Sequence, residues 1–396
     1  MRMLRRVLVT AALIVPAISG AQPREIAGAA FIDVNRNGVR DAGERGLAHV
    51  VVSNQDAVVA TDASGAYRLS RGPNGLLFVS VPDGYRTVGP FWRAVEDTTS
   101  TVDFPLSPAA RSTGFTFIHA SDPHVAPAVV ARLQRFRALA DSLHPAFVLI
   151  TGDLVRDALR VGEGEATGYY ELFQREAALF TSPLWTVPGN HENFGIERAK
   201  SHVPAAHPLY GRKMYHHYRG PDYYSFNYGG VHFVGLNSVD IDDQSYYGHV
   251  DSLQLAWLER DLAMVPAGTP VVTFEHIPFF SSIEALNGYT EEPPAPTLIT
   301  VDGKTVFRHT VSNAEAVLAV LRSHRHVLAL GGHMHVGERI QYSVDGLQTK
   351  FNQTPAIVGP TEGAGMRFTS GFTLYTVRNG AIDAGRFIPL GIDKQQ

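Results

Sequence analysis

Five short apolar stretches of this chain each predict a β-strand, and each is followed at once by residues that can bind a metal ion. The stretches cover residues 115–119, 147–151, 184–187, 271–274 and 327–330. Helical patterns lie between several of them, over residues 128–143, 169–180 and 251–263. This alternation of strands and helices predicts an α/β domain. In such a domain the carboxyl ends of the strands share one edge, where a site can form.

The residues that follow these stretches form one set of seven candidate metal ligands. The set comprises Asp122, His124, Asp153, Asn190, His276, His333 and His335. A single histidine after a strand is more often an ordinary hydrogen-bonded residue. The pair His333 and His335 is more informative, because alternate residues can point the same way. Because all five strands are followed by residues of this kind, a shared metal site is a better explanation than five unrelated polar residues.

Taken in order along residues 113–390, the motifs D-x-H, G-D, G-N-H-E, H and G-H-M-H resemble the calcineurin-like metallophosphoesterase superfamily. The resemblance implies an αββα fold, a sandwich of two β-sheets flanked by helices. One metal ion would then bind Asp122, His124 and His335, and a second would bind Asn190, His276 and His333. Asp153 would bridge the two ions. His191 would lie beside the substrate as a catalytic residue that binds neither ion.

This ligand set suits the hydrolysis of phosphoric esters. A bridging carboxylate offsets the repulsion between two cations, and neutral ligands leave both cations Lewis-acidic. A hydroxide between the ions would attack phosphorus, while His191 stabilises phosphoryl oxygens or protonates the leaving group. Glu192 or Asp157 would orient His191, with a plain surface role equally open for both. Iron, manganese or zinc fits these ligands.

The predicted substrate is a small-molecule, lipid or nucleotide phosphoester, and monoesters and diesters both remain open. Residues 119–122 resemble the start of the cyclic-nucleotide phosphodiesterase branch. Purple acid phosphatases, a neighbouring branch, place a tyrosine ligand three residues after the bridging aspartate. Arg156 stands there in this chain, so the iron–tyrosinate colour of that branch is not expected.

Residues 23–108 have a different pattern, in which short apolar stretches alternate with Gly, Asn, Asp and Pro. This predicts a small antiparallel β-domain. Together with the loop described next, residues 61–67 resemble prealbumin-like or Cna-B-like β-sandwich modules that precede some exported calcineurin-like phosphoesterases. Residues 107–112 predict the linker to a catalytic domain over residues 113–390. The tail, residues 338–388, predicts strands that complete the second sheet.

A loop in this N-terminal module matches the calcium-loop spacing D-x-N-x-N-G-x₅-E at every defined position. Its candidate ligands are Asp33, Asn35, Asn37, Asp41 and Glu44. The flanking residues predict strands rather than helices, so the loop does not belong to an EF-hand. Calcium binding and a turn closed by side-chain-to-backbone hydrogen bonds therefore both remain open.

The first residues predict an exported protein, periplasmic or secreted. Arg2, Arg5 and Arg6 precede an apolar run over residues 7–18, and small residues follow at 19–21. This pattern is typical of a signal peptide over residues 1–21, with an uncleaved anchor as the alternative. No other stretch predicts a membrane span, and with 0 Cys there are no disulfides or thiolate sites. The oligomeric state has no sequence marker.

Other classes of function fit the sequence less well. A formal net charge of -4 gives no broad basic surface for nucleic acid. The main alternative is a calcium-dependent surface-binding protein that carries a degenerate enzyme domain. The complete ligand set argues against it, because degeneration would remove ligands. Metal storage is a further alternative, and His191 argues against that one because storage has no use for a histidine that binds no metal.

Overall fold

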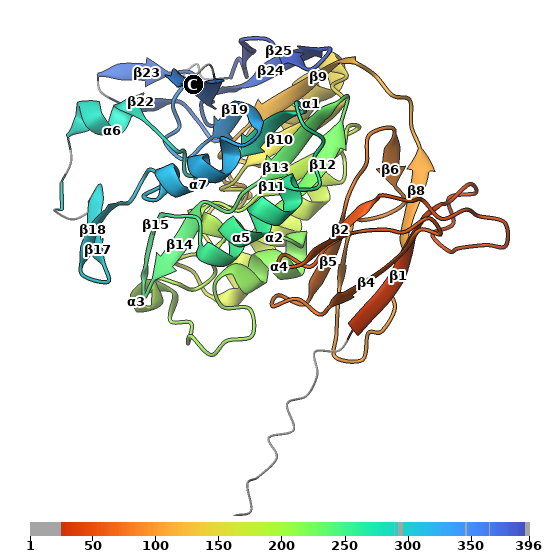
Figure 1. Ribbon diagram of the computed structural model, residues 1–396. Helices are drawn as coiled ribbons and strands as arrows, with labels where there is room; N and C mark the ends of the chain where they lie inside the picture. The colour runs from red at the N-terminus through yellow and green to blue at the C-terminus, as the bar shows by residue number, and fades with distance from the viewer. Residues whose placement is uncertain (1–24, 289, 292–295, 345–346, 364, 393–396) are drawn as a thin grey trace, which may run out of the picture.

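The computed structural model describes residues 25–288, 290–291, 296–344, 347–363 and 365–392. The expected signal peptide, residues 1–21, lies outside the described residues. Within them, no helix combines the length and the apolar character that crossing a membrane requires. Figure 1 shows an all-β module, formed by the N-terminal strands, on one side of a larger α/β region.

The N-terminal module consists of eight short strands: β1 (Glu25–Ile32), β2 (Val51–Ser53), β3 (Val58–Ala60), β4 (Ala66–Ser70), β5 (Leu76–Ser80), β6 (Tyr85–Thr87), β7 (Trp92–Ala94) and β8 (Phe104–Pro108). They form two four-stranded sheets, with the orders β4-β1-β8-β6 and β3-β2-β5-β7. All pairs are antiparallel except β1 with β8. The expected antiparallel domain therefore contains one parallel pair, between its first and last strands.

The linker starts later than the sequence predicts. Ser107 and Pro108 pair with Arg86 and Tyr85 in the β6–β8 ladder, so they belong to β8. Residues 109–113 then lead directly into the first strand of the α/β region. Serine and proline are typical linker residues, but here they end β8, beyond the residues of that strand that pair with β1.

The α/β region contains two six-stranded sheets. The first has the order β11-β10-β9-β24-β25, with β26 also paired to β24; its strands are β9 (Gly114–Ala120), β10 (Phe147–Thr151), β11 (Leu184–Val187), β24 (Gly371–Arg378), β25 (Ala381–Ile382) and β26 (Arg386–Pro389). The second has the order β12-β13-β16-β19-β21-β20; its strands are β12 (Tyr224–Tyr228), β13 (Val231–Gly235), β16 (Pro270–Phe274), β19 (Arg325–Gly331), β20 (Glu338–Val344) and β21 (Leu347–Gln353).

Three small hairpins and eight helical segments complete the described chain. The hairpins pair β14 (Val239–Asp242) with β15 (Ser245–Gly248), β17 (Leu298–Val301) with β18 (Lys304–Phe307), and β22 (Thr361–Gly363) with β23 (Met366–Phe368). The helices are α1 (Val130–Leu143), α2 (Glu163–Ala177), α3 (Arg198–Ser201), α4 (Arg212–Arg219), α5 (Ser252–Leu262), α6 (Ser282–Asn287), α7 (Ala314–Leu321) and the 3₁₀ turn η1 (Asn190–Glu192).

The two sheets pack face to face, with helices on their outer faces, as the αββα expectation requires. Phe117 of β9 lies 5.6 Å from Phe233 of β13, measured between ring centroids. The neighbouring residue Ile118 points to the opposite face, where it packs in one cluster with Phe136 of α1 and Phe173 of α2. Successive side chains of a strand alternate between faces, so each strand serves both interfaces.

The tail differs from the sequence expectation. Strands β20 and β21 do join the second sheet, but β24 pairs antiparallel with β9 over residues 373–378 and belongs to the first sheet. The tail is therefore divided between the two sheets, and β22 and β23 form a hairpin of their own. Alternation of apolar residues predicts strands, but it does not say which sheet a strand joins.

The N-terminal module packs tightly against the second sheet and α5. Gln55 donates a hydrogen bond to the buried carboxylate of Asp222 at 2.8 Å. Trp257 of α5 donates to the Ser53 hydroxyl at 3.1 Å, and its ring lies edge-on to Phe78. Because these contacts are buried, the module is a fixed part of the structure rather than a loosely tethered unit.

Candidate metal centre

The structure brings all seven candidate ligands to one edge of the two sheets. Strands β9, β10 and β11 are parallel to each other, and so are β13, β16 and β19. The residues that follow β9, β10, β11, β16 and β19 therefore meet where these strands end. Two groups gather His and Asp ligand atoms within 4.8 Å of one another: Asp122 with His124 and His335, and Asp153 with His276 and His333.

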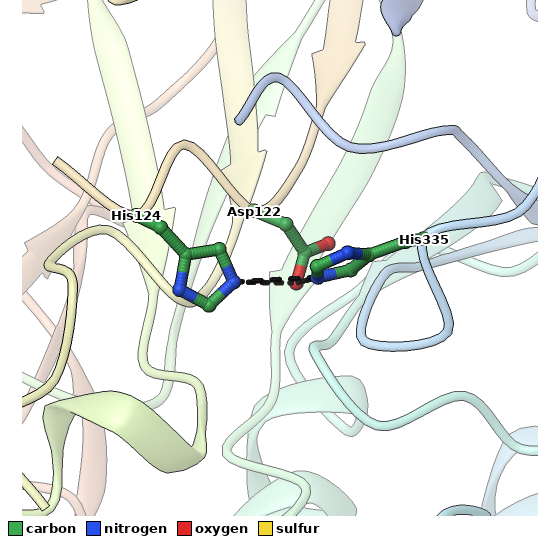
Figure 2. Close-up of side chains that lie close together, drawn as sticks. All are labelled: Asp122, His124 and His335. Atoms are coloured by element: carbon green, nitrogen blue, oxygen red, sulfur yellow. Dashed lines mark hydrogen bonds and ion pairs between the residues drawn. The ribbon is translucent and has the colours of Figure 1, made fainter. Parts of the chain in front are cut away.

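In the first group, three atoms face a common point (Figure 2). Nε2 of His335 lies 3.2 Å from Oδ1 of Asp122, and Nε2 of His124 lies 3.8 Å from the same oxygen. The two Nε2 atoms are 3.3 Å apart. Within the described chain, Asp122 Oδ1 is buried without a hydrogen-bond donor. A buried oxygen of this kind needs a partner, and a cation at the common point would supply it.

In the second group, hydrogen bonding leaves one nitrogen of His276 free for a ligand. Its Nδ1 donates to the carbonyl of Thr151 at 2.8 Å, so in the neutral ring Nε2 carries the lone pair that a cation would bind. That Nε2 lies 3.1 Å from Oδ1 of Asn190 and 3.2 Å from Nδ1 of His333. Three different donor atoms thus surround one point.

Asp153 reaches both groups with separate oxygens. Its Oδ1 lies 3.3 Å from Nε2 of His276, in the second group. Its Oδ2 lies 3.4 Å from Nε2 of His124, in the first group. The side chain is buried, and these two contacts are the geometry expected of a bridging carboxylate.

The backbone at this edge is strained in a way that marks functional sites. Five of the candidate ligands have positive φ angles, which side chains other than glycine rarely adopt: Asp122, His124, Asp153, His333 and His335. The adjacent glycines are needed for space. A Cβ atom on Gly189 would lie 2.1 Å from Oδ1 of Asp153, and one on Gly152 would lie 2.6 Å from Nδ1 of His276. The glycines of these motifs therefore allow the ligand loops to approach closely.

Glu192 holds the loop that carries Asp153 through hydrogen bonds to its backbone. Its carboxylate is fully buried and accepts hydrogen bonds from the backbone N–H groups of Asp153, Val155 and Gly189. Burial, followed by the charge of Asp153, raises the pKa of Glu192 to about 8. Glu192 therefore holds the Asp153 loop, and it does not take the surface role or the contact with the His191 ring that the sequence left open.

His191 is oriented by a backbone carbonyl. Its Nδ1 donates to the carbonyl oxygen of Arg156 at 2.7 Å, while Asp157 is more distant, with Oδ1 at 3.6 Å. The other nitrogen, Nε2, then faces the site, 3.9 Å from Oδ2 of Asp153. His191 also forms a third possible ligand group with His124 and Asp153. A backbone acceptor has no sequence pattern, which is why Arg156 was not predicted in this role.

The charges of the site depend strongly on one another. Burial opposes protonation of His276, but the carboxylates of Asp153 and Asp122 raise its pKa to about 9. Burial lowers the pKa of His124 to about 4. Burial would raise the pKa of Asp153, yet the surrounding histidines, His276 first, lower it well below its usual value. The donor set of imidazole nitrogens, carboxylates and an amide oxygen fits borderline divalent or trivalent cations such as iron, manganese or zinc.

A cleft of about 320 Å³ lies over the ligands and is lined by His124, Asp153, Asn190, His191, Tyr246, Glu284, His309, His333, Met334 and His335. Residues 279–310 and residues 193–222 both follow ligand-bearing strands, so the sequence predicts that each segment either shapes the substrate pocket or simply covers the core. Glu284 and His309 come from the first of these segments. The other segment, residues 193–222, contributes none of the described lining residues. Its Tyr215 instead donates a buried hydrogen bond to Thr186. Tyr289, Pro293 and Pro294 of the first segment lie outside the described residues.

The candidate calcium ligands lie together in one loop, but they bond to one another and to the backbone. Asp33 accepts hydrogen bonds from the backbone N–H groups of residues 36, 37 and 38. Oδ2 of Asp41 accepts from the amides of Asn35 and Asn37, at 2.7 and 2.9 Å. Glu44 accepts from the backbone of residues 34 and 41. This is the closed turn that the sequence left open beside calcium binding.

Comparison with known protein families places this geometry in context. A model of the calcineurin-like phosphoesterase family matches residues 115–337, more than half of the chain. A model of the N-terminal domain that accompanies calcineurin-like phosphoesterases matches residues 34–109. The two matches lie within the α/β region and the N-terminal module, respectively.

Individual relatives are more distant. A 3',5'-cyclic-nucleotide phosphodiesterase from Nostoc is 26% identical over 52% of this chain and 60% of its own length. Purple acid phosphatase 15 from Arabidopsis thaliana is 33% identical over 30% of this chain and 18% of its own. The chain thus spans less than two thirds of either relative. Among solved structures, GAP50, the anchor in the inner membrane complex of Plasmodium, is 12% identical, with a TM-score of 0.41 over 71% of this chain and 86% of its own.

Proposed function

The chain belongs to the calcineurin-like phosphoesterase family, and on that premise we propose that it is a metal-dependent phosphoric ester hydrolase with a dinuclear site. The observation that carries the proposal is the position of Asp153, which directs one carboxylate oxygen to each of two ligand groups. One ion is held by Asp122, His124 and His335, and the other by Asn190, His276 and His333. Asp153 is shared between them.

Each residue of the site has a distinct task. The site would hold two cations, which would supply Lewis acidity and lower the pKa of a bound water molecule. The Thr151 carbonyl keeps the proton of His276 on Nδ1, which preserves Nε2 as a donor. Glu192 holds the Asp153 loop at the fixed depth that a shared ligand needs.

His191 handles a proton on the open side of the cleft. Because its Nδ1–H donates to the Arg156 carbonyl, its Nε2 is directed toward the substrate region. A proton on that nitrogen can be donated to the leaving oxygen, or it can stabilise charge on the phosphoryl oxygens. His191 is therefore a catalytic residue in this proposal, and it does not bind an ion.

The substrate is a small-molecule, lipid or nucleotide phosphoester. The names of the relatives support both chemical classes, since one is a cyclic-nucleotide phosphodiesterase and the other an acid phosphatase. Arg156 replaces the tyrosine ligand expected in purple acid phosphatases. The iron-loaded protein should consequently lack an intense visible charge-transfer band, which an absorption spectrum would test; a purple preparation would mean that another tyrosine binds iron.

The enzyme acts outside the cytoplasm, in the periplasm or as a secreted protein. This part of the proposal is supported by the sequence of residues 1–21, with its arginines, apolar run and small residues. Calcium binding by the loop of the N-terminal module stays a prediction, because the hydrogen bonds inside the loop already engage its carboxylates.

The proposed function is tested by loading metal-free protein separately with iron, manganese and zinc. Each form is assayed on p-nitrophenyl phosphate and on bis(p-nitrophenyl) phosphate, so that monoester and diester hydrolysis are compared with one leaving group. At least one metal should give hydrolysis together with two bound ions per chain. Absence of hydrolysis with every metal on both substrates would contradict the proposal.

A further inference from the structure

His309 contacts one of the candidate ligands directly and has no role in the site described so far. It follows β18 and lies on the wall of the cleft. Its Nδ1 is 2.7 Å from Nε2 of His333, and the two rings are nearly parallel, with centroids 5.0 Å apart. Such a short distance between two ring nitrogens requires that one of them donates a proton and the other accepts it.

The second nitrogen of His333 decides the direction of this hydrogen bond. Nδ1 of His333 faces Nε2 of His276 at 3.2 Å, on the side where Asp153 and His276 gather. A ring nitrogen that binds a cation carries no proton, so the proton of neutral His333 belongs on Nε2. His333 Nε2–H therefore donates to Nδ1 of His309. For Nδ1 of His309 to accept this proton, the proton of the neutral His309 ring must lie on its other nitrogen, Nε2.

We propose that His309 is a positioning residue that keeps His333 in the tautomer and orientation needed to bind the second ion. This inference rests on the dinuclear site of the proposed function and adds a residue to it. The partner of a metal-binding histidine usually fixes the tautomer, and removing that partner typically costs about 10–100-fold in metal affinity. His309 acts through His333 and contacts no reacting atom.

The test is a Mn²⁺ titration of metal-free wild-type protein and of two variants. His309→Phe keeps a planar ring against Tyr246 but removes the acceptor, and His309→Asn keeps an acceptor near the position of Nδ1. We expect His309→Phe to bind one of the two Mn²⁺ ions about 10–100-fold more weakly, and His309→Asn to recover most of that loss. Equal affinity of His309→Phe and wild type, or no recovery in His309→Asn, would overturn the proposal.

A control separates positioning from disturbance of the hairpin. Thr305 is exposed on β18, so Thr305→Leu should bind Mn²⁺ like the wild type; a matching loss there would also overturn the proposal. Thermal unfolding of each metal-free variant checks folding, and if His309→Phe does not fold, His309→Leu replaces it. Wild-type protein that binds fewer than two Mn²⁺ ions would instead contradict the dinuclear site itself.

Discussion

Two regions of this molecule carry sequence patterns typical of metal binding, yet their side chains behave differently. In the loop over residues 33–44, the acceptors are already engaged: Asp33 and Glu44 bind backbone N–H groups, and Asp41 binds two amides. At the edge of the two sheets, Asp122 Oδ1 has no donor within the described residues, and two imidazole nitrogens face it.

The difference comes from where the ligands originate. In a short loop, neighbouring backbone N–H groups and side-chain amides can reach every carboxylate, so the loop can close without an ion. At the ends of the separate strands, backbone N–H groups reach only part of the carboxylates. They donate to Oδ1 of Asp153 and to Oδ2 of Asp122, but Oδ1 of Asp122 is buried without a donor among the described residues. Leaving buried polar atoms unpaired costs free energy, about 1–3 kcal/mol for a group. Convergence of distant ligands is thus a stronger indication of a metal site than spacing along the chain.

The largest expected effect comes from removing the shared ligand. Asp153→Asn should abolish hydrolysis and reduce bound metal below two ions per chain, because one carboxylate serves both groups. The loss of metal affinity should exceed the ~10–100-fold loss that is typical when a residue supporting a metal ligand is replaced. Metal analysis beside a rate measurement tests this, with Asp41→Asn in the N-terminal loop as the matched control that leaves hydrolysis unchanged. If Asp153→Asn kept two tightly bound ions and full activity, Asp153 would not be a shared ligand. The sheet edge would then no longer differ from the N-terminal loop in its need for a metal ion.

His191→Ala should lower the rate by about 10²–10⁴ while metal content stays near that of the wild type. A leaving-group series sharpens the result. If His191 protonates the leaving oxygen, the loss should shrink for nitrophenolate, which needs little protonation; if it stabilises phosphoryl oxygens, the loss should be similar for all leaving groups. Loss of one ion would mean that His191 is a ligand, in the group it forms with His124 and Asp153.

Glu192→Gln should destabilise the metal-free protein. The buried carboxylate accepts three backbone hydrogen bonds, and an amide offers one acceptor oxygen and a donor where an acceptor is needed. Above about pH 8, where Glu192 is ionised, we expect a loss of about 1–3 kcal/mol in the free energy of unfolding, measured with denaturant. An unchanged unfolding free energy would show that these three bonds do not hold the Asp153 loop.

The strands, and the residues that converge as candidate ligands, could be predicted because they have local patterns. Apolar runs mark the buried strands, and the motifs that follow name the ligands. Other elements lacked a usable pattern. Helix α2 begins at Glu163, six residues before the predicted start at 169, because glycines at 164 and 168 obscure its helical pattern. Helix α7 was not predicted at all, since eight residues with few polar positions show little periodicity.

The surroundings of the site were much harder to predict than its ligands. The Arg156 carbonyl orients His191, and backbone atoms carry no residue-type pattern. Residues 279–310 were expected near the pocket, but only the packed structure shows that Glu284 and His309 are the residues that reach it. Tyr246 comes from outside both expected segments. Sequence motifs therefore name the candidate metal ligands, whereas tertiary packing determines what positions those residues and shapes the pocket.

The smallest expected effect is that of calcium on the N-terminal loop. It tests whether this loop, unlike the ligand groups at the sheet edge, can do without a metal ion. If Asp33, Asn35, Asn37, Asp41 and Glu44 bind Ca²⁺, the hydrogen bonds now made by Asp41 must be exchanged for the ion. At a calcium concentration ten times the dissociation constant, binding would add about 1.4 kcal/mol to the unfolding free energy.

Calorimetry with calcium and with chelator should then show a higher melting temperature for the N-terminal module in calcium, with hydrolysis of small substrates unchanged. Asp41→Asn should remove that calcium dependence, because the Asp41 carboxylate accepts hydrogen bonds from both Asn35 and Asn37, two other candidate ligands. Magnesium at the same concentration is the matched control, since a site with calcium-loop spacing favours the larger ion. If the melting temperature is the same with calcium and with chelator, the closed turn is the correct interpretation of the loop. This one chain would then show that residues with calcium-loop spacing do not form a metal site unless ligands from separate elements also converge on one point.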